Sequence, residues 1–233
     1  MQFRRLGSSA VVAAALTLSA GAAAALTVPF TEDFTSTVVG WEDSINNPLT
    51  YVASGGPDGG SYASGTFNYF NFTNPFGGGP VTFRGQDEDS ASGLAFVGDW
   101  ITGGVDSLSI WVRQNTSETL SYFLRVAGTA NFPGAVINST TLVAPNTWTQ
   151  VTFDIDPASP LCFGEGVTCA QALASVFHVQ FGTTAPAALT ALNQAFTLDI
   201  DKVSISSVPE PGVALLLAGG LAGLAWQGRR RTA

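Results

Sequence analysis

Hydrophobic and polar residues alternate along the middle of the chain with the two-residue period of a β-strand. The clearest run is residues 107–113, in which Leu108, Ile110 and Val112 occupy every second position. Residues 120–126 and 151–155 repeat the pattern. Because successive side chains of a strand point to opposite faces of the sheet, each run predicts a strand with one buried face.

The rest of the central region reads as short strands separated by glycine-rich turns. Glycine and proline concentrate at 55–60 and 77–80, where glycine tolerates positive φ and proline fixes its own backbone angle. Only residues 169–175 read as a helix. The other predicted strands are residues 29–34, 49–54, 61–67, 81–84, 94–100, 177–181 and 195–206. This pattern predicts an all-β fold, an antiparallel β-sandwich with one short helix.

The N-terminal segment has the features of a signal peptide. Arg4 and Arg5 precede an apolar stretch at 10–25, and this stretch ends in three alanines, as signal-peptidase sites do. We therefore expect signal peptidase to remove residues 1–25 by cutting between Ala25 and Leu26. The folded domain would then be residues 26–207, which is long enough to bury a sizeable core.

The C-terminal segment has three parts in a fixed order. They are Pro209-Glu210-Pro211, an apolar run at 213–226, and the cluster Arg229, Arg230 and Arg231. A helix over the 14 apolar residues would be about 21 Å long, whereas a typical bilayer span needs about 20 residues. The run is thus marginal as a permanent anchor. Positive flanks resist translocation, so the arginines would stay in the cytoplasm and the domain would face outward.

This order of elements resembles the PEP-CTERM sorting signal, with residues 208–233 as the signal. The resemblance implies export by a Gram-negative cell that makes exopolysaccharide. It also implies transient membrane insertion and cleavage near the Pro-Glu-Pro motif by an exosortase-type enzyme. The alternative is an ordinary tail anchor that contains the motif by chance.

The charge of the predicted domain argues against nucleic acid as a partner. The chain has nine basic and seventeen acidic residues, but five of the basic residues and Glu210 lie in the two targeting segments. The domain keeps four basic and sixteen acidic residues, a net charge of −12. Such a surface repels phosphate backbones.

Cys162 and Cys169 are the two cysteines of the chain. In an exported protein they are expected to form one disulfide. A redox pair would favour a two-residue spacer, and a zinc site would need further cysteines or histidines. The sequence therefore favours a structural disulfide over both alternatives.

Several segments together resemble laminin B domains, which belong with the jelly-roll, galactose-binding-like sandwiches. The matching segments are residues 54–62, 96–100, 108–113 and 148–153. Residues 32–34, with Gly40-Trp41, and residues 200–205 also resemble the first and last strands of carbohydrate-binding jelly rolls. The resemblance implies a jelly-roll β-sandwich. Lys202 stands where that group usually has a second aspartate, which leaves one family carboxylate without a counterpart.

The sequence contains little that points to catalysis. His178 is the sole histidine and falls in the polar phase of a predicted strand, so we expect it to be exposed and not to be a catalytic base. Glycoside hydrolysis needs only two carboxylates, and the domain has many. The acidic run at 87–89 reads as a solvated loop or as metal ligands.

Aromatic residues cluster between asparagines in residues 67–76. Tyr69, Phe70 and Phe72 are candidate glycan-binding residues, because exposed rings stack on sugar faces while asparagine amides bond hydroxyl groups. The alternative is a set of core residues beneath a long loop.

Acidic residues lie near both ends of the predicted domain, and the resembled jelly rolls bring those ends side by side. Carboxylates held that close repel each other unless a cation lies between them, and calcium accepts six to eight oxygen ligands in irregular geometry. We therefore predict a structural calcium ion; the alternative is ordinary solvated acids. The candidate ligands are Glu32, Asp33, Asp58, Asp199 and Asp201.

These observations predict an exported, surface-sorted β-sandwich protein without enzymatic activity. It would serve in the extracellular polymer or biofilm matrix as an adhesive or glycan-binding component, with exopolysaccharide as a partner. The alternative is a glycan-cleaving hydrolase that uses paired carboxylates on the same fold. An aromatic groove with two facing carboxylates would favour the hydrolase.

Overall fold

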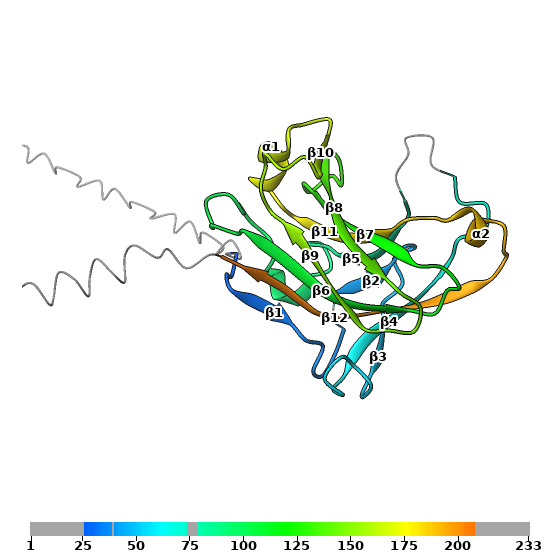
Figure 1. Ribbon diagram of the computed structural model, residues 1–233. Helices are drawn as coiled ribbons and strands as arrows, with labels where there is room; N and C mark the ends of the chain where they lie inside the picture. Colours follow the sequence, from blue (N-terminus) through cyan, green and yellow to red (C-terminus); the bar gives the residue numbers. More distant parts are fainter. Residues whose placement is uncertain (1–25, 39, 74–78, 208–233) are drawn as a thin grey trace, which may run out of the picture.

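The computed structural model describes residues 26–38, 40–73 and 79–207, which form two antiparallel sheets packed face to face (Figure 1). Sheet A has the strand order β3-β4-β12-β6-β9, with β1 also paired to β12, and sheet B has the order β10-β8-β7-β11-β5-β2. Sheet A comprises β1 (Phe30–Glu32), β3 (Thr50–Val52), β4 (Tyr62–Asn68), β6 (Ser107–Gln114), β9 (Thr149–Asp154) and β12 (Ala195–Ser206). Sheet B comprises β2 (Trp41–Asp43), β5 (Val81–Gly85), β7 (Leu120–Ala127), β8 (Gly134–Val143), β10 (Cys162–Glu165) and β11 (His178–Thr183). The predicted antiparallel β-sandwich is confirmed.

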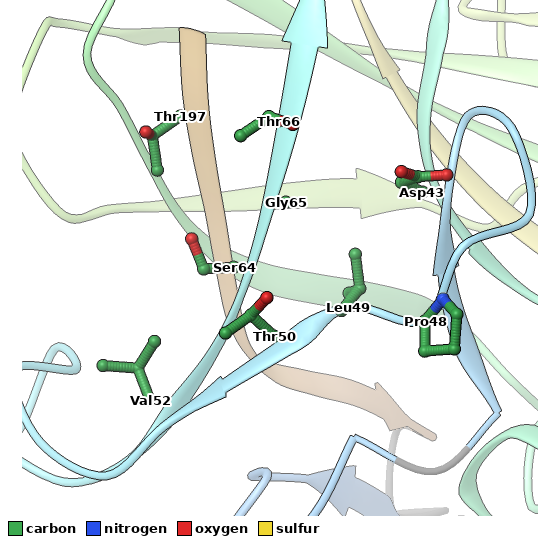
Figure 2. A pocket seen from close by; sticks show the side chains of 9 residues that line it. All are labelled: Asp43, Pro48, Leu49, Thr50, Val52, Ser64, Gly65, Thr66 and Thr197. Atoms are coloured by element: carbon green, nitrogen blue, oxygen red, sulfur yellow. The ribbon is translucent and has the colours of Figure 1, made fainter.

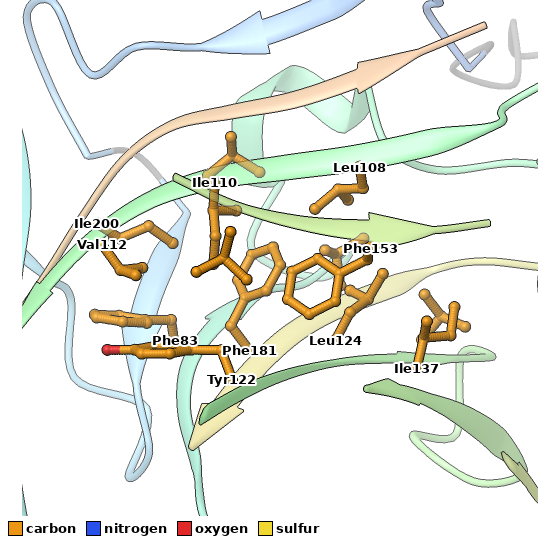
Figure 3. Packing of buried hydrophobic residues seen from close by; sticks show 14 of the residues in the cluster. Phe83, Leu108, Ile110, Val112, Tyr122, Leu124, Ile137, Phe153, Phe181 and Ile200 are labelled. Carbon is orange, nitrogen blue, oxygen red and sulfur yellow. The ribbon is translucent and has the colours of Figure 1, made fainter. Parts of the chain in front are cut away.

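The core lies between the sheets and is built from their alternating inner residues (Figure 3). Leu108, Ile110 and Val112 of β6 are fully buried, as their two-residue spacing predicts. Phe181 of β11 stacks on Phe153 of β9, with ring centroids 6.0 Å apart, so that aromatic rings bridge the two sheets. Such contacts stabilise the sandwich through apolar burial and favourable ring geometry.

Two short α-helices accompany the sheets. The predicted helix at 169–175 is confirmed as α1 (Cys169–Leu173), and a capping box between Thr168 and Gln171 satisfies the first backbone donors of this helix. The second helix, α2 (Ala187–Thr190), was not predicted because four residues are too few to show a helical period.

The prediction of a strand at 94–100 is wrong. The chain forms a 3-10 helix at Ala91–Leu94 and then turns, with one isolated bridge between Gly98 and Val176. Trp100 is fully buried and donates from Nε1 to the carbonyl oxygen of Phe96, 2.8 Å away. The apolar residues of this segment thus enter the core from a turn, which an alternation pattern does not distinguish from a short strand.

Strand β12 contains a bulge at Lys202, which has a φ of 48°. The register with β6 shifts between Asp201 and Ser204. Ile200 before the bulge and Val203 after it are both buried in the core, while Asp201 lies on the outer face. The extra residue therefore lets the strand keep its apolar side chains inward on both sides of the bulge.

The predicted disulfide between Cys162 and Cys169 is present and joins the start of β10 to the start of α1. The predicted signal peptide, including Ala25, and the whole sorting segment lie outside the described residues, so the structure does not test them. Among the described ranges, no helix is long and apolar enough to cross a bilayer.

We predict that the double substitution Cys162→Ala/Cys169→Ala lowers the free energy of unfolding by about 2.5 kcal/mol, because the bond closes a loop of eight residues in the unfolded chain. Urea denaturation measures this difference. Reductant should shift the wild-type midpoint by a similar amount and leave the variant unchanged. Equal midpoints for wild type and variant without reductant would contradict the prediction.

Candidate functional site

A row of polar side chains crosses the outer face of sheet B. The strand registers align Glu42 of β2 with Arg84 of β5, Arg84 with Gln180 of β11, and Gln180 with Arg125 of β7. Residues that face each other across paired strands lie on the same face of the sheet. These four residues, which we call the polar row, therefore lie side by side on the outer side of the sheet, where Gln180 is covered and the other three are half-buried.

Arg125 is the centre of hydrogen bonding in the polar row. Its Nε donates to Oε2 of Glu165 at 2.7 Å, and its Nη1 donates to Oδ1 of Asn131 at 2.8 Å and to Oε1 of Gln180 at 2.9 Å. Its Nη2 also donates to the backbone oxygen of Asn131 at 2.7 Å. A guanidinium group has donors only, so these contacts fix which atom of each amide is the oxygen.

The orientation set by Arg125 passes along a chain of amides. With Oε1 of Gln180 turned to Arg125, its Nε2 donates to Oε1 of Gln86 at 3.3 Å. Gln86 in turn donates from Nε2 to Oε1 of Glu88 at 2.9 Å. Gln86 and Gln180 are both buried, so hydrogen bonds hold the network in one arrangement before any ligand arrives.

His178 was expected to be exposed, and this expectation is wrong, because only 1% of the residue is accessible. It starts β11, a central strand of sheet B whose six residues are all buried. Its Nδ1 lies 3.3 Å from Oδ1 of Asn131, and its Nε2 lies 3.1 Å from Oδ1 of Asp87 and 2.9 Å from Oε2 of Glu88. Two residues of the acidic run at 87–89, Asp87 and Glu88, thus cover the imidazole.

The two carboxyl groups beside His178 have opposite pKa shifts. Burial, and then the hydrogen bond and charge of Glu88, raise the pKa of Asp87 above its ordinary value. Burial alone would also raise the pKa of Glu88, but hydrogen bonds from Asp87 and the backbone, together with His178, outweigh it and lower the pKa. Of the two carboxyl groups, Asp87 therefore keeps a proton more readily, and Glu88 keeps its negative charge more readily.

Arg84 is the second guanidinium of the polar row. Its Nε is buried and has no hydrogen-bond partner within the part of the chain that the structure describes. Its charge lowers the pKa of Glu42, but burial and Asp89 act more strongly in the opposite direction, so the pKa of Glu42 is raised overall. The row thus contains one guanidinium whose three nitrogens all donate hydrogen bonds and one with an unused donor.

Two exposed aromatic residues lie beyond the Arg125 end of the polar row. Phe163 of β10 pairs with Val136, which pairs with Arg125, and 55% of Phe163 is exposed. Phe132, next to Asn131 in sequence, is 62% exposed. A Cβ atom on Gly166 would lie only 2.9 Å from the Phe132 ring, so glycine permits this close approach.

The aromatic site predicted from the sequence does not form as expected. Tyr69 is fully buried, its hydroxyl lies 2.7 Å from Oγ1 of Thr183, and burial raises its pKa to about 12. Tyr69 is therefore a core residue, and its assignment to glycan binding is wrong. Phe70 is 41% exposed and Phe72 is half-buried, so these two remain accessible in part.

The five predicted calcium ligands are divided among separate interactions. Asp199 accepts from Nε of Arg113 at 2.8 Å and from Oγ of Ser64 at 2.7 Å. Glu32 accepts from the backbone nitrogen of Phe34 at 3.0 Å. These contacts occupy two of the five carboxylates with partners in the protein.

Asp58 and Asp201 lie near Lys202. The Lys202 ammonium is 2.8 Å from Oδ2 of Asp58, and the Lys202 backbone nitrogen donates to Oδ1 of Asp201 at 2.7 Å. In the described ranges, the five carboxylates do not gather into one group of ligand atoms. The donor set does not fit a single ion held by all five residues, and calcium binding remains a prediction.

On the outer face of sheet A, the side chain of Arg113 packs against two aromatic rings. The Arg113 guanidinium lies 5.1 Å from the centre of the Tyr62 ring and 4.8 Å from that of Trp148. Nε1 of Trp148 donates to the backbone oxygen of Gly55 at 2.8 Å. This stack fixes the glycine-rich 55–60 turn against the sheet.

A hollow of about 230 Å³ lies beside this face, where β3 and β4 separate beyond Thr50 (Figure 2). Ser64, Thr66 and Thr197 supply hydroxyl groups to it, and Leu49 and Pro48 supply apolar surface. Its lining is therefore neutral apart from Asp43. It lacks the connected amides and guanidinium of the polar row.

Sequence reasoning did not identify Arg125, Gln180 or Asn131. The spacing of His178 and Gln180 puts them on one strand face, and Arg125 falls in the polar phase of 120–126, so these three could have been grouped as outer-face residues. Asn131 lies in a turn, and its sequence gives no sign that it would reach His178.

We predict that Asp201→Asn raises the melting temperature at pH 7 in the presence of a chelator. Burial raises the pKa of Asp201 to about 6, so folding favours its neutral form and stability falls as the pH rises from about 4 to about 6. Asparagine stays neutral and should remove that part of the pH dependence. Melting curves at pH 4, 5, 6 and 7 measure it, and equal curves for both proteins would contradict it.

Melting curves of the same two proteins in excess calcium test whether a calcium ion binds. A calcium ion bound through Asp201 would stabilise the wild type, and the asparagine variant would lose that gain. A wild-type midpoint unmoved by calcium would contradict the calcium prediction, while the pH prediction would stand.

Comparison with known proteins gives a match for the tail and a likeness for the domain. Residues 207–231 match the PEP-CTERM protein-sorting motif. No curated protein sequence matches the chain significantly. An exo-beta-agarase structure is similar with a TM-score of 0.50 and 9% identity, over 78% of this chain and 26% of that chain.

Two smaller structures from Clostridium thermocellum are also similar. The C-terminal family 22 carbohydrate-binding module of Xyn10B has a TM-score of 0.43 and 12% identity, over 76% of this chain and 92% of that chain. A family 11 carbohydrate-binding module has a TM-score of 0.46 and 10% identity, over 78% of this chain and 97% of that chain. The chain spans about a quarter of the agarase and of a xylanase that it also matches. At these identities the likeness concerns the fold alone.

The motif implies export, anchoring at the C-terminal end and processing by an exosortase. The chain therefore carries a PEP-CTERM protein-sorting motif at residues 207–231, which follows an antiparallel β-sandwich.

Proposed function

We propose that this protein is a non-catalytic glycan-binding protein of the cell surface, and that its ligand lies along the polar row of sheet B. The observation that carries the proposal is the combination of hydrogen-bonded amides and guanidinium groups with exposed rings at one end. The side chains of Arg125 and Glu165 are partly accessible, and the exposed Phe132 and Phe163 lie next to them. The buried Gln180 holds Arg125 in place from beneath.

This combination suits a polysaccharide for two physical reasons. Sugar hydroxyl groups both donate and accept hydrogen bonds, and the partly accessible groups of Arg125, Asn131 and Glu165 offer directed partners for them. Sugar rings have apolar faces that pack on aromatic side chains. Because the network around Arg125 is already ordered, binding would lose little side-chain entropy there.

Export and sorting fit this role. We propose that signal peptidase cuts after Ala25, that the C-terminal segment inserts briefly in the membrane, and that an exosortase then removes it. The domain would reach the cell surface or the extracellular polymer layer and act there as an adhesive or matrix component. Exopolysaccharide is the expected partner, and the strongly acidic domain favours neutral chains over anionic ones.

We predict that Phe163→Ala weakens polysaccharide binding about tenfold, because it removes an exposed ring that would stack on a sugar. Affinity gel electrophoresis of surface-released protein measures this with xylan, mixed-linked β-1,3-1,4-glucan, agarose and the producing cell's exopolysaccharide. The first three probes are glycans named for the similar structures or cleaved by the similar enzymes.

Phe70→Ala is the matched control, because Phe70 is also exposed and belongs to the aromatic segment at 67–76, away from the polar row. It should leave affinity unchanged. If Phe70→Ala weakens binding and Phe163→Ala does not, the ligand lies along that segment. Absence of binding to all four polysaccharides would contradict the proposed function.

We also predict that the C-terminal segment is removed on the way to the surface. Intact-mass analysis of surface-released wild-type protein should show loss of residues after the Pro-Glu-Pro motif. The substitution Pro209→Ala/Pro211→Ala should leave uncut protein in the membrane fraction, because it alters the residues that match the motif. Released protein still ending at Ala233 would contradict this prediction.

A further inference from the structure

His178, Asp87 and Glu88 bring three metal-ligating atoms together where β11 of sheet B begins. One ligand atom from each residue lies within 4.8 Å of the others, which is the one such group found among the described residues. The His178 side chain is 2% exposed, whereas that of Glu88 is 52% exposed. The imidazole is therefore held inside the protein, and the carboxylate side opens toward solvent.

The hydrogen bonds of Asn131 determine which nitrogen of His178 carries a proton in the neutral ring. Oδ1 of Asn131 accepts from Nη1 of Arg125 at 2.8 Å and from Nε2 of Gln180 at 3.0 Å. Because a guanidinium group only donates, this atom must be the amide oxygen. Nδ1 of His178, 3.3 Å from the same oxygen, is then the N–H donor.

With the proton on Nδ1, the neutral imidazole has its lone pair on Nε2. That lone pair faces Oδ1 of Asp87 at 3.1 Å and Oε2 of Glu88 at 2.9 Å. Three electron-rich atoms at these distances repel one another unless a cation lies between them. The cation is either a proton, held on Nε2 or on a carboxyl group, or a metal ion.

The geometry is close to that of a metal centre. Tetrahedral bonds of about 2.0 to 2.1 Å separate neighbouring ligand atoms by about 3.3 Å, so small side-chain shifts would admit an ion. The supporting contacts also resemble those of metal sites, in which outer partners orient each ligand. Asn131 orients the imidazole, and Gln86 donates to the second oxygen of Glu88 at 2.9 Å.

We propose that His178 Nε2, Asp87 Oδ1 and Glu88 Oε2 bind a divalent first-row transition metal of the zinc class. One imidazole and two carboxylates suit such a cation better than calcium, which prefers oxygen ligands alone. Three protein ligands leave a fourth position open toward the exposed side of Glu88. This site is distinct from the predicted calcium ligands and does not depend on glycan binding.

Zinc titration of the full chain, purified in detergent with a tag that contains no histidine, tests the proposal. Isothermal calorimetry should show one zinc ion per chain, and His178→Gln should weaken its affinity at least about 100-fold, since even outer partners of metal ligands contribute about 10-fold to 100-fold. Asp89→Asn is the matched control, because it removes the same charge as Asp87→Asn from the same loop without removing a ligand. It should change affinity less than about threefold, whereas Asp87→Asn should follow His178→Gln.

A second measurement needs no substitution at His178. The chain has a single histidine, so its ¹⁵N resonances report the site directly. Saturating zinc should shift Nε2 to a metal-bound value while Nδ1 keeps its proton. Resonances of a doubly protonated imidazole that persist in saturating zinc would show that a proton is the cation and would overturn the proposal. Undiminished zinc affinity of a folded His178→Gln variant would overturn it too.

Discussion

Strand β11 is buried on both faces, and this constraint links the core to the polar surface. Val179 and Phe181 enter the hydrophobic core, while His178 and Gln180 face the other way and are still inaccessible to solvent. Buried polar groups are costly unless they are hydrogen-bonded. The neighbouring strand and the loops around β11 must therefore supply partners, and Arg125, Asn131 and Gln86 do so.

The network has a fixed direction because it begins at a group that only donates. Arg125 fixes Gln180, Gln180 fixes Gln86, and Gln86 donates to Glu88. Each amide could reverse its ends if it were isolated, but a reversed Gln180 would present its NH₂ group to the guanidinium. The loop acids and the imidazole are thus held in one arrangement from the middle of the sheet.

Alternating hydrophobicity predicted the fold well, and the exceptions have a common cause. The pattern of 107–113 gave the correct inner face of β6 because one face of that strand meets the core. The same pattern at 177–181 gave the correct inner residues of β11 but the wrong exposure for His178, because alternation does not show whether a loop covers the outer face. The assignment of Tyr69 to a binding site was wrong for a related reason. Its phenol enters the core and bonds to Thr183, which is 114 residues away in the sequence.

The candidate sites depended on ion pairs between residues far apart in the sequence, and spacing along the chain does not show such pairs. Asp199 and Asp201 were both predicted as calcium ligands, yet Asp199 pairs with Arg113 from the neighbouring strand and Asp58 pairs with Lys202. Three of the domain's four cations, Arg113, Arg125 and Lys202, each contact a carboxylate. In a domain with sixteen acids, the positions of these few cations decide which carboxylates remain available to a ligand.

The bulge in β12 has a consequence for how this strand tolerates changes in length. Because Lys202 is the extra residue, removing it would leave Ile200, Val203 and Ile205 at alternate positions and all still directed inward. Removing a residue from the regular part of the strand would instead turn every later apolar side chain toward water. Position 202 is thus a site in the central strand of sheet A where an evolving lineage can shorten the chain by one residue without inverting the sheet.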